Sequence, residues 1–223
     1  MAERTRQIAR LRWHLVDLCP ELEASIPARQ LDSGPMLERI ARSLRREQRT
    51  ARVRVALELV VSIRAISRQA DTLEREVHTL IMAYRPGLLA AQGCGTLTAA
   101  TLIGRTAGAE RFPTDAHFAR PAGVAPIPVS SGRKDRHRLH RGGDRQLNRA
   151  LHVIAITRAR IDPETRAYLD RKRSEGKTNR EALRCLKRHL ARHIHRLLSM
   201  PPDHPDPKTR IQPNHAISVP CLT

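Results

Sequence analysis

The sequence has very few aromatic residues and no long hydrophobic run. Phenylalanine, tyrosine and tryptophan make up 2% of the 223 residues, so the aromatic platforms on which single-strand-binding and RNA-recognition-motif proteins stack bases are not expected. No apolar stretch is long enough to cross a bilayer, and the arginine-rich N-terminus lacks the apolar core of a secretory signal. We therefore expect a cytoplasmic protein without a membrane partner.

Cysteines are scarce, and their spacing shows no pairs: Cys19, Cys94, Cys185 and Cys221. Neither a disulfide framework nor a zinc knuckle is therefore expected. Cys185, His189 and His193 follow one another at four-residue steps, but no glutamate or fourth ligand accompanies them, and histidines on a basic helix usually face solvent or phosphate. No metal site is predicted in this chain.

Basic residues greatly outnumber acidic ones. Lysine and arginine total 41 against 22 aspartates and glutamates, a formal charge of +19. Arginine dominates, and its planar fork matches phosphate oxygens, so the expected partner is a nucleic acid rather than a membrane surface. A structural protein of the ribosomal kind would share this charge. Hydrophobic residues at 40% are enough to build a core for one or two domains.

The first third of the chain is predicted to be helical. A short helix and a loop occupy residues 1–34, and a long helix covers 35–85, with apolar residues from Val53 to Leu80 at steps of three and four. A seam of this length favours a coiled coil that joins copies of the chain. The alternative is a helical hairpin that packs on itself and breaks at the polar run from Arg45 to Arg49.

A glycine turn follows the long helix. Residues 86–108 read as helix, Gly-x-Gly turn and helix, which resembles a helix-hairpin-helix element. In such an element, the turn and the following helix start bind a DNA phosphate through backbone N–H groups. We predict phosphate contacts at Gly93, Gly95 and Thr96, although a plain turn between helices would show the same pattern.

Residues 144–199 are predicted to form three basic helices. Asp144 and Asp162 are expected N-caps, and Thr178 with Glu181 forms a capping box. Arg145 and Arg149 lie on the first of these helices. The last helix carries a basic residue at every fourth position, where phosphate contact would relieve the mutual repulsion: Arg180, Arg184, Arg188, Arg192 and Arg196. Residues 200–223 are rich in proline and predict a disordered tail.

The segment 121–143 contains serines within a dense basic loop. A serine oxygen attacks phosphorus only where positive charge stabilises the transition state, and glycine lets the backbone approach a phosphate. A flexible phosphate clamp would have a similar composition. The cations expected to hold flanking phosphates are Arg133, Lys134, Arg136, Arg138 and Arg141.

The order of these motifs resembles the C-terminal half of the IS110 family of insertion-sequence transposases, which is related to DNA invertases of the pilin-gene type. The match uses GCGTLTAATLIGRTAG, RF-x5-FAR-x2-GVAP, the SSG loop, RGGDRQLNRALH and EGKTNREALRCLKRHL. It extends from about Thr5 to Leu198. The resemblance implies a mainly α fold, in which a long coiled-coil helix precedes a helical transposase domain at 86–199.

The resemblance further implies what the chain does and needs. Ser131, rather than Ser130, would be the nucleophile, and the serine ester would conserve the energy of the broken DNA bond. Family members add a RuvC-like domain that binds magnesium and a structured guide RNA. No acidic tetrad is recognisable in this chain, so we expect a truncated transposase that acts on bacterial, nucleoid-associated DNA once a RuvC-like domain is supplied. The alternatives are a non-catalytic regulator that dimerises with full-length transposase, or a basic RNA-associated protein.

Overall fold

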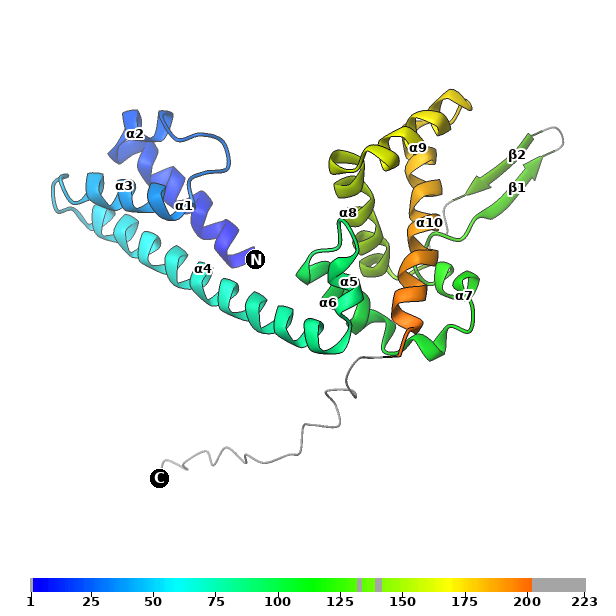
Figure 1. Ribbon diagram of the computed structural model, residues 1–223. Coiled ribbons are helices and arrows are strands. Elements are labelled where there is room, and N and C mark those ends of the chain that lie inside the picture. Colours follow the sequence, from blue (N-terminus) through cyan, green and yellow to red (C-terminus); the bar gives the residue numbers. More distant parts are fainter. Residues whose placement is uncertain (1, 132–133, 139–141, 202–223) are drawn as a thin grey trace, which may run out of the picture. The chain divides into compact units, whose positions relative to one another are not determined.

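The computed structural model describes residues 2–131, 134–138 and 142–201, with residues 129–131 and 134–138 described by their backbone. Within this part the chain is mainly helical, as predicted, with one two-stranded hairpin (Figure 1). It divides into an N-terminal unit, Met1–Arg75, and a C-terminal unit, Glu76–Thr223. The predicted tail at 202–223, like Arg133 and Arg141, lies outside the described residues.

The N-terminal unit is built from α1 (Ala2–Leu18), α2 (Pro20–Ala24), α3 (Gly34–Leu44) and the first part of α4 (Ala51–Tyr84). Its core joins one apolar face of each long helix, with Leu11 and Leu15 from α1 and Ile40 from α3 fully buried. Arg4 makes two of the contacts that tie α1 to the rest of the unit. Arg4 donates from Nε to Ser67 Oγ at 2.9 Å and pairs with Asp32 at 2.6 Å.

The expected continuous helix over 35–85 is wrong in extent, because α3 ends at Leu44 and α4 begins at Ala51. Thr50 lies at the start of α4, where its Oγ1 accepts from Val53 N at 3.3 Å. The break lets the apolar faces of α3 and α4 share the core that holds Val60 and Ile63. Burying both faces within one chain removes apolar surface from water, which a single straight helix does not achieve. The helical hairpin is the correct alternative for this part.

The long helix itself is confirmed over Ala51–Tyr84, about 50 Å of helix at a rise of about 1.5 Å per residue. Its seam divides in two. Val53, Val60 and Ile63 are buried within the N-terminal unit, whereas Leu73 is 52% exposed and Leu80 is 58% exposed. A coiled-coil contact between copies stays a prediction, and only the second half of the seam has exposed leucines for it.

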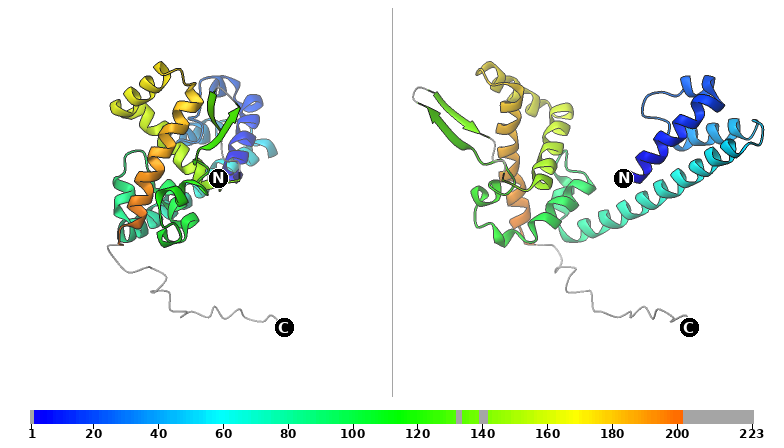
Figure 2. Two further views of the ribbon diagram at one scale, coloured as in Figure 1. Left: turned by 90° about the vertical axis from the view of Figure 1, so that its right-hand side faces the viewer. Right: turned by 180° about the vertical axis from the view of Figure 1, so that it is seen from behind.

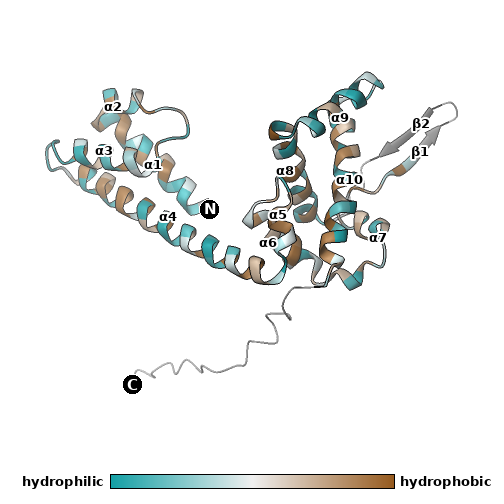
Figure 3. Cartoon of the chain, viewed as in Figure 1, coloured by the Kyte–Doolittle hydropathy of each residue, from teal (hydrophilic) through white to brown (hydrophobic). Residues whose placement is uncertain are grey.

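The helices of the C-terminal unit surround α10 (Asn179–Ser199), which contacts α5 (Pro86–Ala90), α7 (Asp115–Ala119), α8 (Arg145–Ile161) and α9 (Pro163–Ser174). α6 (Thr96–Thr106) packs on α8, and a short 3-10 turn covers Ala109–Arg111. Figure 3 shows hydrophobic and hydrophilic residues alternating along α10. The hydrophobic ones, among them Leu190 and Ile194, are buried with Phe118 and Leu151 in one core.

The caps expected from the sequence are confirmed. Asp144 accepts from Gln146 N and Leu147 N, and Asp162 accepts from Glu164 N. Thr178 and Glu181 form the capping box at the start of α10. These three caps begin the three basic helices where the sequence placed them.

Candidate nucleic-acid interface and serine hairpin

The predicted serine loop contains an antiparallel hairpin, β1 (Ile127–Ser131) and β2 (Lys134–Arg138). Figures 1 and 2 show it extending away from the helices of the C-terminal unit. The loop prediction missed these strands. Ile127 and Val129 alternate with other residues, and a glycine at 132 stands where only two residues separate the strands. Both are hairpin signals in the sequence.

The register of the hairpin separates the two serines. Ser131 is opposite Lys134, and Ser130 is opposite Asp135. Directly opposed residues share a face and alternate residues along a strand share a face, so Ser131 takes a register position on the face of Lys134, Arg136 and Arg138. Ser130 shares the other face with an acidic residue.

The two ends of the hairpin segment meet at the start of α8. A Cβ added at Gly143 would lie 2.7 Å from Gly123 Cα, so only glycine permits this approach. Asp144 N donates to Pro121 O at 2.6 Å, and Asn148 Nδ2 donates to Ala122 O and Gly123 O at 3.0 and 3.2 Å. We call this junction the hairpin root.

Asp144 links the hairpin root to α6. Its carboxylate caps α8 and accepts from Arg105 Nε at 2.7 Å. Burial raises the pKa of Asp144, but the hydrogen bonds from Arg105 and from the backbone N–H groups of Leu147 and Gln146 outweigh burial and leave it below its usual value. The carboxylate is therefore charged at neutral pH and holds Arg105 beside the root.

The basic helices contribute exposed guanidinium groups. Arg145 and Arg149 on α8 are exposed, as are Arg180, Arg192 and Arg196 on α10, while Arg184 and Arg188 are half-buried. The five arginines of α10 do not share one face of the helix. A step of four residues turns about 40° around a helix axis, so the first and last of these arginines differ by about 160°.

Two of these arginines also have acidic partners that the sequence argument did not anticipate. Arg192 Nε lies 3.1 Å from Asp115 Oδ2 of α7, and Arg184 Nη2 lies 4.0 Å from Glu181. Arg192 is therefore largely occupied within the protein. Arg180, Arg188 and Arg196 are the arginines of α10 that no ion pair of the described residues engages.

The glycine turn is shaped by packing as well as by any ligand. Gly93 has φ +83°, and a Cβ there would lie 3.1 Å from Ile154 O and 3.0 Å from Arg158 Cγ of α8. Gly95 is the N-cap of α6, and a Cβ there would meet nothing within 4 Å. Gly93 is thus required for the contact with α8. Phosphate binding by Gly95 and Thr96 at the start of α6 stays a prediction, and so does the helix-hairpin-helix interpretation.

The histidines and cysteine of α10 have structural neighbours. The ring of His189 makes an edge contact with Tyr168, with centroids 5.4 Å apart. Across the residues that the structure describes, no group of three or more His, Cys, Asp or Glu side chains is placed to hold a metal ion. A metal brought by a RuvC-like domain stays a prediction. No helix within the described ranges is both long and apolar enough to span a bilayer.

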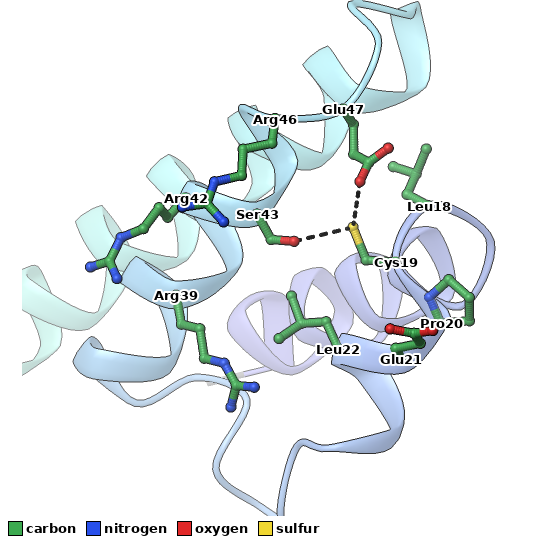
Figure 4. A pocket seen from close by; sticks show the side chains of 10 residues that line it. All are labelled: Leu18, Cys19, Pro20, Glu21, Leu22, Arg39, Arg42, Ser43, Arg46 and Glu47. Carbon is green, nitrogen blue, oxygen red and sulfur yellow. Dashed lines mark hydrogen bonds between the residues drawn. The ribbon is translucent and has the colours of Figure 1, made fainter.

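Sequence reasoning missed two hollows. One, of about 370 Å³, lies between α8 and α10 and is lined by Asn148, His152, Arg180, Leu183, Arg184 and Lys187. The other, of about 720 Å³, lies in the N-terminal unit, and Figure 4 shows Arg39 and Arg42 of α3 along it, with Arg46 from the turn after α3. Glu21 and Glu47 share its lining, and Cys19 Sγ lies 3.6 Å from Ser43 Oγ. The first lining has no acidic residue, and the second mixes both charges.

Comparison with known proteins identifies the central part of the chain. Residues 87–170 match the family described as Transposase IS116/IS110/IS902. The chain is 40% identical over 134 residues to an insertion element IS110 uncharacterized 43.6 kDa protein of Streptomyces coelicolor, an alignment that covers 58% of this chain and 33% of that protein. It is 36% identical over 136 residues to an insertion element IS900 uncharacterized 42 kDa protein of Mycobacterium paratuberculosis, covering 60% and 32%.

The chain thus spans about a third of the length of these curated relatives. The matched residues run from the start of α5 into α9 and include α6, the serine hairpin and all of α8. Over residues 87–170 the chain is therefore similar to the Transposase IS116/IS110/IS902 family.

Proposed function

We propose that the chain is the DNA-binding part of an insertion-sequence transposase and that Ser131 is its nucleophile. The observation that carries the proposal is the register of the hairpin, which places Ser131 on the same face as Lys134, Arg136 and Arg138. A hairpin face that carries basic residues together with Ser131 suits the negative charge that develops when phosphorus is attacked.

The proposed step conserves bond energy. The Ser131 oxygen bonds to phosphorus, the bond from phosphorus to one sugar oxygen breaks, and that oxygen receives the proton given up by the serine. The products are a phosphoserine ester and a DNA end with a free hydroxyl. Attack by a sugar hydroxyl on the ester reverses the step, so rejoining needs no ATP.

The proposal includes partners that the resemblance implies. DNA would bind through phosphate contacts on the hairpin, α8 and α10, and a structured RNA would guide the chain. Self-association would use the second half of α4, where exposed Leu73 and Leu80 are one heptad apart. Magnesium and the groups that activate Ser131 would come with a RuvC-like domain.

A covalent trapping experiment tests the nucleophile. The chain is incubated with labelled DNA and a full-length transposase of the same family that supplies the RuvC-like domain and guide RNA but has its own serine replaced. We expect a denaturant-resistant adduct on this chain, and Ser131→Ala should abolish it while leaving DNA affinity nearly unchanged.

Ser130→Ala is the matched control because it removes the neighbouring hydroxyl, whose register position is on the other face of the hairpin. An adduct lost with Ser130→Ala and kept with Ser131→Ala would show that the other serine is the nucleophile. DNA binding without any adduct would favour a non-catalytic regulator. Preference for structured RNA over duplex DNA, again without an adduct, would favour an RNA-associated protein.

A further inference from the structure

The cleft between α8 and α10 contains a buried lysine without a carboxylate partner. Lys187 is 7% exposed, and its Nζ donates to Asn148 Oδ1 at 2.9 Å. No carboxylate of the described residues lies within ion-pair distance of this ammonium group. A buried charge that has only a neutral amide for a partner is costly, and a bound anion would offset that cost.

The other charged groups around Lys187 are of the same sign. Arg180 and Arg184 line the cleft with His152, and Glu181, which is not among the lining residues, has its carboxylate 4.0 Å from Arg184. Burial, followed by the Arg184 charge, lowers the pKa of Lys187; burial, followed by the Lys187 charge, lowers the pKa of His152. Lys187 and His152 are therefore harder to protonate than usual, and a bound anion would favour their protonated forms.

The amide of Asn148 has its orientation set by the hairpin root. Its Nδ2 donates to the carbonyl oxygens of Ala122 and Gly123, so its Oδ1 must face Lys187. Asn148 therefore holds the ammonium group at the inner end of the cleft and connects the cleft to the segment that carries Ser131. Arg180, which is exposed, and Arg184, which is half-buried, stand at its outer rim.

We propose that this cleft binds one backbone phosphate of the DNA that the chain contacts, with Lys187 at its base and Arg180 and Arg184 at its rim. The inference rests on the proposed DNA-binding function. The guanidinium groups of Arg180 and Arg184 have the geometry to donate paired hydrogen bonds to phosphate oxygens, and Lys187 Nζ supplies a further donor. A phosphate held there lies beside the hairpin root and fixes the strand relative to the hairpin.

The test measures the binding of a labelled DNA duplex to the full chain by fluorescence anisotropy over a series of salt concentrations. Each phosphate contact contributes about 0.9 to the slope of log affinity against log salt. Lys187→Gln should reduce the slope by about one contact and weaken binding on the order of tenfold. The double variant Arg180→Gln and Arg184→Gln should do the same, and its positions are accessible enough to leave folding intact.

Lys177→Gln is the matched control, because it makes the same change of residue and charge at a lysine that pairs with Glu175 outside the cleft. Its slope should equal that of the wild type. Unchanged slopes in the cleft variants, with normal salt-dependent binding by the wild type, would overturn the phosphate site alone. Salt-independent DNA binding by the wild type would overturn the proposed function itself.

A second arm separates a DNA phosphate from free phosphate. The melting temperature of each protein is measured in sodium phosphate and in sodium chloride at equal ionic strength. Stabilisation by phosphate that the cleft variants lose, together with their reduced DNA slope, supports the site. Such stabilisation with an unchanged DNA slope would mean that the cleft binds inorganic phosphate only, and the inference would be wrong.

Discussion

The N-terminal unit holds 15 basic against 10 acidic residues, whereas the C-terminal unit holds 26 against 12. Ion pairs engage about half of the acids in both: five in the first unit and six in the second. The two units differ in the excess of basic over acidic residues, which is 5 in the N-terminal unit and 14 in the C-terminal unit. The excess of positive charge therefore concentrates in the unit that carries the hairpin.

The hollows of the two units differ in the same way. The hollow of about 720 Å³ in the N-terminal unit has Arg39, Arg42, Arg46, Glu21 and Glu47 in its lining, while the α8–α10 cleft is lined by cations, a neutral amide, a histidine and a leucine. Mixed charges satisfy each other, whereas like charges at close range need an external anion. We therefore expect the α8–α10 cleft to attract an anion more strongly than the hollow of mixed charge.

The largest expected effect concerns salt. If about six phosphates are neutralised, DNA affinity should fall on the order of a thousandfold between about 50 and 200 mM salt. The triple variant Arg145→Gln, Arg149→Gln and Arg180→Gln should reduce the slope of log affinity against log salt by the equivalent of about two to three phosphate contacts. All three exposed groups lie on the basic helices of the C-terminal unit. The measurement is anisotropy of a labelled duplex.

The matched control removes the same charge from exposed arginines of the N-terminal unit, with Arg10→Gln, Arg54→Gln and Arg68→Gln. Its salt dependence should remain that of the wild type. Equal flattening in both triple variants would show that only net charge matters and that the two units do not differ in DNA binding.

The next effect concerns self-association along α4. Leu73→Glu and Leu80→Glu should convert an oligomer into a monomer in light scattering, because each puts a charge into the exposed part of the seam. Thermal stability should change little. Leu57 is a poorer probe, because it packs against the core of its own unit. A wild-type chain that is already monomeric at high micromolar concentration would contradict the coiled-coil contact.

A smaller effect is expected at the hairpin root. Gly143→Ala should destabilise the C-terminal unit by about 1–3 kcal/mol, because the added Cβ meets backbone atoms that have little room to move. Gly95→Ala is the control, since a Cβ there meets nothing within 4 Å. Urea unfolding measures both, and a Gly143→Ala cost no greater than that of Gly95→Ala would refute the close approach at the root.

The smallest effect is a difference in acid sensitivity. Burial, with nearby cations, lowers the pKa of His152, His189 and His193 in the C-terminal unit, and that of His14 in the N-terminal unit. A lowered pKa means that the folded state resists protonation, so stability present above about pH 6.5 is lost as the pH falls further. Amide protection factors, corrected for the intrinsic exchange rate, should therefore fall more in α8 and α10 than in α1 and α3 between about pH 7 and 5. Equal loss of protection would contradict this.

Local signals predicted much of the fold and little of the cleft. Asp144, Asp162 and Thr178 begin helices because each cap needs only residues two or three positions away. The break between α3 and α4 depends on how two apolar faces share a core, which sequence periodicity does not reveal. The link from Asn148 to Lys187 spans 39 positions, and its donor and acceptor meet only through the packing of α8 on α10.

The most direct test of the comparison maps where DNA touches the chain. A duplex containing bromodeoxyuridine is cross-linked to the full chain by light, and the modified peptides are identified by mass spectrometry. The account predicts that cross-links concentrate in the C-terminal unit, on the hairpin, α8 and α10. Cross-links concentrated in Met1–Arg75 would contradict it.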